Sequence, residues 1–285
     1  AAQPAPDGLD PVEPYLAFED GPVLIDNVLV LDGAGGPAQS GMSVLLEDGR
    51  IARLAPSGAI EATAGVQVID GTGHTLIPGL VGAHDHTHMP GAPMLQRAAS
   101  RLYLAGGVTT IRTVGAASPM ADLAMARAAE TGSALSPRVA TSAPYVSGPG
   151  DAPVMVQPAS EDEARAFVRR WAETGVGWIK LYRRVEPHIA AAIIDEAHAQ
   201  GLRVAGHLCS LTFEEASELG IDTIEHGLVS ASDFLADKPA GECVGGSVPN
   251  MAHVEADSEA AQRVFATLVE NGTALVSTLA IVESR

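Results

Sequence analysis

The stretch Pro78-Gly79-Leu80-Val81-Gly82-Ala83-His84-Asp85-His86 marks the point at which the secondary-structure pattern of the sequence changes. From Leu80 onward, apolar runs of strand length alternate with alanine-rich helical stretches, and this alternation predicts βα units and a parallel sheet. The helices carry their own end signals, because a capping box at 160–163 begins one, and Pro187 and Gly201 bound another. The predicted strands are residues 80–86, 108–114, 139–145, 178–182, 203–207, 223–228 and 274–281.

These seven strands predict an α/β fold of the (β/α)8 TIM-type barrel class in which strand eight is missing. A barrel closes with eight strands, and Arg285 follows the seventh by only a few residues, so we expect the natural protein to continue beyond Arg285. An open doubly wound sheet needs no eighth strand and is the alternative architecture.

The sequence before this region predicts two further parts. Residues 1–21 carry four prolines and no periodicity, which indicates an irregular N-terminal arm. Residues 22–79 predict a small β domain, since strand-like runs occupy 23–31, 42–46, 50–54 and 66–70. Asp48-Gly49 favours a tight hairpin between the second and third runs, because Asp-Gly supplies positive φ angles. Residues 80–285 are then the incomplete barrel.

Charge and hydropathy exclude two classes of partner. The 285-residue chain has 17 Lys and Arg against 35 Asp and Glu, a formal net charge of −18, which is the wrong sign for a nucleic-acid binder. No uncharged apolar run approaches the roughly 18 residues that span a bilayer. We therefore expect a soluble protein that binds a small-molecule substrate and neither nucleic acid nor membrane. A homo-oligomer is left open.

The N-terminal residues and the two cysteines bear on location. Residues 1–6, AAQPAP, are similar to the small-residue, Pro-rich stretch that remains after signal-peptide removal, although no apolar segment precedes them. We expect a periplasmic or secreted protein, with a cytoplasmic one as the alternative. Cys209 and Cys243 would then form a disulfide, whereas two reduced buried thiols are the other reading.

Histidines end three of the predicted strands. His84 and His86 share one face of the first strand because side chains alternate along a strand, so both imidazoles can hold one metal ion. His207 and His226 each end a strand, at the rim where barrels gather their functional groups. His88 lies past the strand end and is expected to be a solvated loop histidine. The other histidines are assigned to turns or helices without a role: His74, His188, His198 and His253.

Lys180 lies in the middle of the predicted strand 178–182, between apolar neighbours. If it faces inward, desolvation disfavours the charged amine and leaves a nucleophilic lone pair. Such a lysine forms a Schiff base with a carbonyl substrate, or reacts with CO2 to give a carbamate that bridges two cations. A structural ion pair with a barrel carboxylate is also open. The four histidines favour the carbamate, since imidazole suits zinc-like ions and adds nothing to a Schiff base.

With these residues in this order, the chain resembles the amidohydrolase superfamily, and within it the prolidase or imidazolonepropionase-like branch. The resemblance covers about residues 22–281 and rests on Pro-Gly-Leu before HxH, a lysine on strand four and single histidines on strands five and six. It implies two divalent cations, commonly zinc. His84 and His86 would hold the first, His207 and His226 the second, and carboxylated Lys180 would bridge them.

The sequence departs from the family pattern in three ways. Gly82 occupies the place of an Asp two residues before the first histidine. The strand-eight Asp, which the resemblance implies as metal ligand and general base, has no counterpart before Arg285 and is expected beyond it. The β strands that complete the small domain after the barrel are also missing.

The resemblance implies that a metal-bridged hydroxide attacks an amide, peptide or cyclic-amide carbonyl and breaks its C–N bond. Tyr145, which ends strand three, could steady the developing oxyanion. Arg183 and Arg184 follow strand four and could hold a substrate carboxylate, which favours a dipeptide or an N-acyl amino acid. A packed tyrosine and two solvated arginines are equally open readings.

Two other functions remain compatible with the sequence. One is a non-catalytic metal-binding or assembly protein on the same fold. The other is a Schiff-base lyase that uses Lys180, which would be indifferent to chelators and trapped by borohydride.

Overall fold

The computed structural model describes residues 12–88, 96–244 and 254–279. Internal contacts divide the chain into a smaller unit that ends at Leu80 and a larger unit that begins at Val81. Among the described residues, none of the helices is both long enough and apolar enough to cross a membrane.

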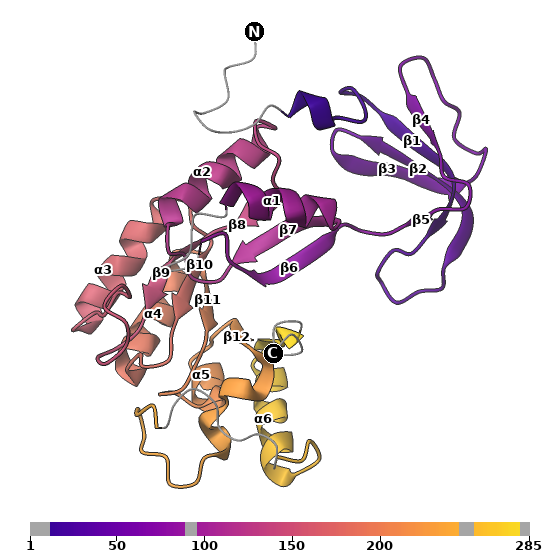
Figure 1. Cartoon of the computed structure of the whole chain (residues 1–285). Coiled ribbons are helices and arrows are strands. Elements are labelled where there is room, and N and C mark those ends of the chain that lie inside the picture. The colour runs from indigo at the N-terminus through magenta and orange to yellow at the C-terminus, as the bar shows by residue number, and fades with distance from the viewer. Residues whose placement is uncertain (1–11, 89–95, 245–253, 280–285) are drawn as a thin grey trace. The chain divides into compact units, whose positions relative to one another are not determined.

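The smaller unit is a five-stranded sheet in the order β3-β2-β1-β4, with β5 paired to β1 (Figure 1). Asp48 and Gly49 have φ angles of 50° and 69°, which confirms the predicted tight turn between β2 and β3. Val28, Val30 and Val44 form its small core. The elements are a 3₁₀ turn Glu13–Tyr15, β1 Val23–Val30, β2 Gln39–Glu47, β3 Arg50–Pro56, β4 Gln67–Asp70 and β5 Thr75–Leu76.

The larger unit alternates strands and helices, as the sequence predicts. Its strands are β6 Leu80–Asp85, β7 Val108–Thr113, β8 Arg138–Ala140, β9 Ser142–Val146, β10 Trp178–Leu181, β11 Arg203–Gly206, β12 Thr223–Glu225 and β13 Ala274–Val276. Its helices are α1 Gln96–Ala105, α2 Pro119–Glu130, α3 Glu161–Ala172, α4 Pro187–Ala199, α5 Phe213–Glu218 and α6 Glu259–Glu270, with 3₁₀ turns at Gly227–Ser230 and Ser232–Phe234.

Two sheets form, β6-β7-β8 and β9-β10-β11-β12-β13. The described strands therefore do not make the single barrel sheet that the sequence predicts, and the architecture they establish is a mixed α/β fold. Each strand pairs with its neighbour in the sequence, so the order never reverses as it does in a doubly wound sheet. The end of the last predicted strand, residues 280–281, lies outside the described residues.

The break between the sheets falls inside the third predicted strand, at Thr141, which separates β8 from β9. At this point hydrogen bonds to side chains take the place of the regular backbone hydrogen bonds between strands. Ser142 N donates to Thr113 Oγ1 over 3.1 Å, and Gly115 N donates to Ser142 Oγ over 3.0 Å. Sequence periodicity does not reveal such a substitution, because residues 139–145 form one continuous run of strand length.

Helices α3 and α4 lie on one side of β9, β10 and β11 (Figure 1). Ser160 caps α3 by accepting a hydrogen bond from Glu163 N, as predicted, but Glu163 Oε2 accepts from Ala159 N instead of completing a capping box with Ser160. The complete capping box belongs to Thr212 and Glu215 at α5.

The helices pack on alternate residues of the strands. Ile179, Leu181 and Ile224 join the same buried core as Val168 of α3 and Ile193 of α4. Because successive side chains of a strand point to opposite faces, the residues between these apolar positions face away from the helices. That face of the sheet carries the candidate site.

Candidate metal centre

The four histidines that end strands lie together. Their ring centroids are 5.2 Å apart for His84 and His86, 4.6 Å for His84 and His226, and 4.5 Å for His207 and His226. The rings come from the carboxyl ends of β6, β11 and β12, so parallel strands bring them to one edge of the fold. The structure thus assembles these four predicted residues into one cluster.

Lys180 reaches the same cluster from β10. Ile179 and Leu181 on either side of it are fully buried under the helices, so the lysine faces the opposite way. Its side chain is 1% exposed, and Nζ has no hydrogen-bond partner among the residues that the structure describes. Burial lowers the Lys180 pKa to about 7, against the opposing effect of the Glu225 carboxylate. Near neutral pH a large share of this amine is therefore uncharged.

The four imidazoles are uncharged as well. Burial is the largest cause, and it lowers the pKa of His86 to about 4, of His226 to about 3 and of His207 to about 2. The pKa of His84 is also lowered by burial, against the raising effect of its hydrogen bond with Glu225. A charge on Lys180 lowers the pKa of all four, which places the amine close to each ring. Neutral imidazoles keep the lone pairs that bind metal ions.

Two charged residues at this site were missed in the sequence. Glu225 is fully buried, and its carboxylate lies 2.6 Å from His84 Nδ1 and 2.8 Å from Arg112 Nη2. Regular alternation places Glu225 on the face opposite His226, so the sequence could not bring both to one site. His226 has a φ of 72°, which breaks the alternation and turns these two neighbours toward the same cluster. A non-glycine residue in this conformation is strained, and such strain gathers at functional sites.

His88 contradicts its prediction as a solvated loop residue. It is only 6% exposed, and its Nδ1 lies 3.1 Å from Asp122 Oδ1. Thr87 Oγ1 donates to the same carboxylate oxygen. The loop after β6 is covered because α2 carries Asp122 to it, a tertiary contact that leaves no trace in the local sequence.

The remaining histidines agree with their assignment where they are described. The His74 ring contacts the backbone of a neighbouring turn, with Nδ1 3.1 Å from Thr72 O. His188 lies on α4 with its side chain about half exposed, and His198 Nε2 lies 3.0 Å from Asp222 Oδ2. His253 lies outside the described residues.

Gly82 leaves room that a carboxylate fills. A Cβ placed on Gly82 would overlap the Asp85 carboxylate. Asp85 Oδ1 accepts a hydrogen bond from the Tyr103 hydroxyl over 2.8 Å, while Oδ2 is buried without a partner. The glycine at position 82 thus leaves space for the carboxylate of Asp85, three residues further along the same strand.

The predicted substrate-binding residues lie beside the cluster. The Tyr145 hydroxyl is 3.2 Å from His86 Nδ1, and burial raises the pKa of this tyrosine, so it stays protonated. A charge on Arg183 contributes to lowering the pKa of His207, which places Arg183 near that ring. Arg184 lines a separate cavity of about 280 Å³ together with Glu186 and Glu242, whose carboxylates disfavour an anionic ligand there.

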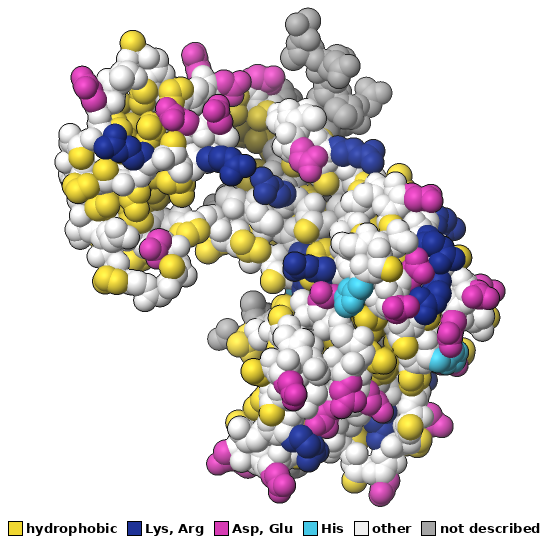
Figure 2. Space-filling view, turned by 180° about the vertical axis from the view of Figure 1, so that it is seen from behind, with side chains coloured by type: hydrophobic (Ala, Val, Ile, Leu, Met, Phe, Trp, Pro, Cys, Tyr) yellow, Lys and Arg dark blue, Asp and Glu magenta, His cyan; other side chains and the backbone are white. Residues whose placement is uncertain are grey.

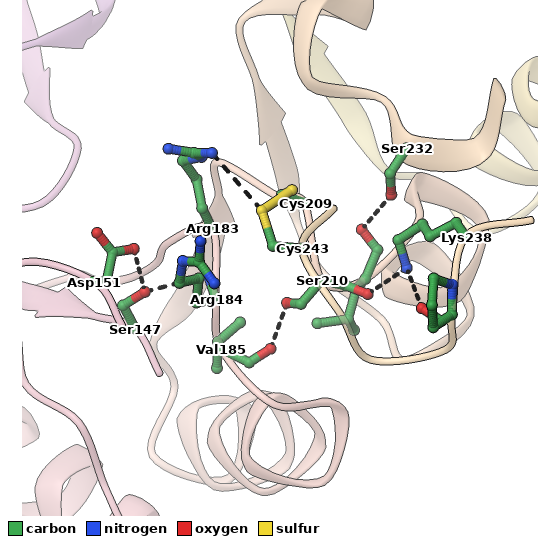
Figure 3. The surroundings of a disulfide bond; sticks show 12 residues. Ser147, Asp151, Arg183, Arg184, Val185, Cys209, Ser210, Ser232, Lys238 and Cys243 are labelled. Atoms are coloured by element: carbon green, nitrogen blue, oxygen red, sulfur yellow. Dashed lines mark hydrogen bonds between the residues drawn. A yellow bond between two sulfur atoms is a disulfide. The ribbon is translucent and has the colours of Figure 1, made fainter. Parts of the chain in front are cut away.

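Cys209 and Cys243 form a disulfide, which decides between the two readings of the cysteines (Figure 3). Cys209 follows His207 by two residues, so the bond ties the loop after β11 to the segment that contains Lys238 and Cys243. Lys238 Nζ donates to Ser210 O over 2.7 Å, and Arg183 Nη2 lies 3.7 Å from Cys243 Sγ. Covalent and polar contacts thus converge on the loop that follows one of the clustered histidines.

The donor set of the cluster fits divalent cations. Four neutral imidazoles suit zinc-like ions, and a buried amine without a partner offers a further group. Within the described ranges, no three His, Cys, Asp or Glu side chains gather in a way that could by themselves hold a metal ion.

The comparisons with known proteins agree on a family. A model of the amidohydrolase family matches residues 75–243. A dihydroorotase of Mycobacterium tuberculosis is 39% identical over 83 residues, which are 28% of this chain and 19% of that protein. An uncharacterized protein of the same organism is 28% identical over 224 residues, 72% of this chain and 56% of that protein.

Solved structures show the same likeness. A provisionally assigned prolidase from Bifidobacterium longum has 30% identity and a TM-score of 0.64, over 73% of this chain and 54% of that one. A Xaa-Pro dipeptidase with bound methionine in its active site shares the fold at 20% identity and a TM-score of 0.68, over 91% of this chain and 67% of that one. The chain spans from about a fifth to about half of the curated relatives.

Proposed function

Since the chain belongs to the amidohydrolase family, we propose that it provides most of the active site of a metal-dependent hydrolase that cleaves a C–N bond of a small molecule. One observation carries the proposal: the buried Lys180 amine has no hydrogen-bond partner and lies among four neutral imidazoles. A purely structural lysine at this depth would be paired with a carboxylate.

The proposed site holds two divalent cations, and zinc suits its imidazole-rich donors best. His84 and His86 would hold one cation, and His207 and His226 the other. Lys180 would supply a shared ligand as a carbamate. The carbamate would form when the neutral amine attacks CO2, which makes an N–C bond, converts one C=O π bond of CO2 into a charged carboxylate oxygen and releases a proton from the nitrogen. When bound, such cations lower the pKa of water and polarise a carbonyl.

The side chains around this centre bind and orient the substrate. The protonated Tyr145 hydroxyl lies beside His86 and can donate to the substrate carbonyl oxygen as negative charge develops on it. Arg183 can bind a substrate carboxylate with its guanidinium. These two groups favour a dipeptide or an N-acyl amino acid. The general base is proposed to be an Asp that follows Arg285.

The acidic composition supports a small-molecule partner. On the face seen in Figure 2, Asp and Glu side chains are spread over the surface with Lys and Arg among them. With a net charge of −18, the protein repels polyanions such as nucleic acids.

The disulfide also supports the expected location. Disulfides persist in oxidising compartments and are rare in the cytosol. We propose export to the periplasm or the medium. Fractionation of the native host should recover the protein outside the cytoplasm, and recovery in the cytosol with both thiols reduced would contradict it.

The proposed function is tested with the full-length natural protein loaded with zinc. The substrate panel contains Xaa-Pro dipeptides, N-acyl amino acids and dihydroorotate, the last as a cyclic amide. We expect hydrolysis of at least one class, lost on chelation and restored by zinc. Hydrolysis that persists after the metal is removed would overturn the proposal, and so would inactivity of the metal-loaded protein on every class.

Metal uptake by the apoprotein is expected to require CO2 and to rise with pH. Because the Lys180 pKa is about 7, the neutral fraction grows from about a tenth at pH 6 to about nine tenths at pH 8. His86, His207 and His226 remain neutral over this range. Zinc uptake measured at a fixed CO2 pressure should follow this rise, whereas equal uptake in CO2-free buffer would contradict a carbamate.

Arg183→Met is expected to raise KM about 10- to 100-fold for substrates with a free carboxylate, since a charged hydrogen bond contributes about 1.5–3 kcal/mol. Carboxamide analogues of the same substrates should change little. Arg184→Met is the matched control, because Arg184 lines the separate cavity. Equal KM effects of Arg183→Met on acids and amides would remove the argument for a carboxylate.

The low pKa of Lys180 also favours one competing function, a Schiff-base lyase. Borohydride reduction in the presence of a carbonyl substrate distinguishes the lyase from the metal-dependent hydrolase. Covalent trapping at Lys180 with activity insensitive to chelators would establish the lyase.

A further inference from the structure

A chain of buried polar contacts runs behind one of the clustered histidines. Glu225 Oε2 lies 2.6 Å from His84 Nδ1. Glu225 Oε1 accepts hydrogen bonds from Arg112 Nη2 over 2.8 Å and from Thr223 Oγ1 over 2.7 Å. Both oxygens of this carboxylate are therefore engaged, and the side chain is fully buried.

Arg112 holds Glu225 and the strand of His84 at the same time. Its Nε donates to Ala83 O over 2.7 Å, and Ala83 immediately precedes His84. Its Nη1 donates to Thr223 Oγ1 over 3.0 Å, and its guanidinium lies 4.3 Å from the centre of the Trp178 ring. With stacking on one face and hydrogen bonds at the edge, the guanidinium has a fixed position between β6, β7 and β12.

The direction of the hydrogen bond to His84 follows from these contacts. Glu225 is paired with Arg112 and accepts one other hydrogen bond, from Thr223 Oγ1, so it acts as a carboxylate. A carboxylate only accepts, and His84 Nδ1 must therefore carry the proton. The lone pair of a neutral His84 is then on Nε2, the ring nitrogen that Glu225 does not contact.

We infer that Glu225, held by Arg112, is a positioning residue that fixes the His84 ring with Nε2 free to bind a divalent cation. This inference rests on the proposed function and adds to it two residues that bind neither substrate nor metal. A carboxylate behind a metal-binding histidine sets its tautomer and strengthens it as a ligand.

The test uses Glu225→Gln in the full-length protein, which keeps the shape and removes the negative charge. The matched control is Glu196→Gln. Glu196 is also buried and accepts a hydrogen bond from Arg169 over 2.9 Å, but it lies on α4 and not beside a clustered histidine. Zinc affinity is measured by chelator competition. We expect a loss of about 10- to 100-fold for Glu225→Gln and no loss for the control.

A second measurement needs no metal. The ¹⁵N shifts of the His84 ring in the metal-free wild type, assigned with His84→Gln, report which nitrogen carries the proton. We expect the proton on Nδ1, and partial transfer to Nε2 in Glu225→Gln.

A proton on Nε2 in the wild type would overturn the inference, and so would wild-type zinc affinity in Glu225→Gln. Either result leaves the proposed function standing if the wild type binds zinc and hydrolyses its substrate. A wild type that takes up no divalent cation overturns the proposed function and this inference together.

Discussion

Lys180→Met is expected to abolish hydrolysis and, at the same time, to make the metal-free protein more stable. The methionine side chain fills similar space but cannot form a carbamate, so the two proposed cations would lose their shared ligand. We expect activity to fall by at least about 1,000-fold, roughly 4 kcal/mol of transition-state stabilisation. The stability gain arises because the buried amine of the wild type resists protonation, whereas the unfolded chain accepts a proton freely.

The sign of the stability effect follows from the lowered pKa. Burial lowers the Lys180 pKa from 10.5 to about 7, so between these values the unfolded state binds more protons than the folded state. The metal-free wild type therefore gains stability as the pH rises through this range. The advantage of Lys180→Met should shrink by about 1.4 kcal/mol per pH unit from pH 7.5 to 9.5.

Denaturant unfolding of both proteins in CO2-free buffer measures this difference. Lys238→Met is the control for the loss of a lysine side chain, because that amine already donates to Ser210 O and Pro239 O. A Lys180→Met protein that retains full activity, or that is less stable than the wild type at pH 7.5, would contradict the account of Lys180.

Gly148→Ala is expected to destabilise the protein by about 3 kcal/mol and to impair activity. A Cβ on Gly148 would overlap the backbone carbonyl oxygen of Arg184 and lie 2.9 Å from its carbonyl carbon. Backbone cannot move aside as a flexible side chain does. The loop after β9 would have to separate from the loop after β10, where Arg184 N donates to Ser147 Oγ over 3.2 Å (Figure 3).

Gly177→Ala is the matched control in the same unit, because the nearest atom to its added Cβ is 4.0 Å away. Thermal and denaturant unfolding should separate the two variants clearly. If Gly148→Ala unfolds at the same denaturant concentration as Gly177→Ala, the two loops do not pack as closely as described.

The strands and the clustered residues could be predicted because each depends on local pattern. The apolar runs and the turn at Asp48-Gly49 report directly on backbone preference, and both are confirmed. The convergence of the histidines follows from parallel strands whose carboxyl ends share one edge. The amidohydrolase family is confirmed by the match over residues 75–243, whereas the metal ligation of each residue stays a prediction.

What the sequence could not predict depends on contacts between distant segments or on single torsion angles. The placement of His226 on the same face as Glu225 follows from the positive φ of His226, and the burial of His88 from Asp122, which lies 34 residues later. The division into two sheets at Thr141 follows from side chains that replace ladder hydrogen bonds. None of these alters the apolar periodicity that sequence interpretation uses.

The most direct test of a two-cation centre is anomalous X-ray diffraction from crystals of the zinc-loaded, full-length protein. We predict two zinc peaks within about 4 Å of each other. One should lie at His84 and His86, the other at His207 and His226, with density for a carboxylated Lys180 between them. Zinc bound elsewhere, or an unmodified Lys180 with no zinc at the four histidines, would contradict the account.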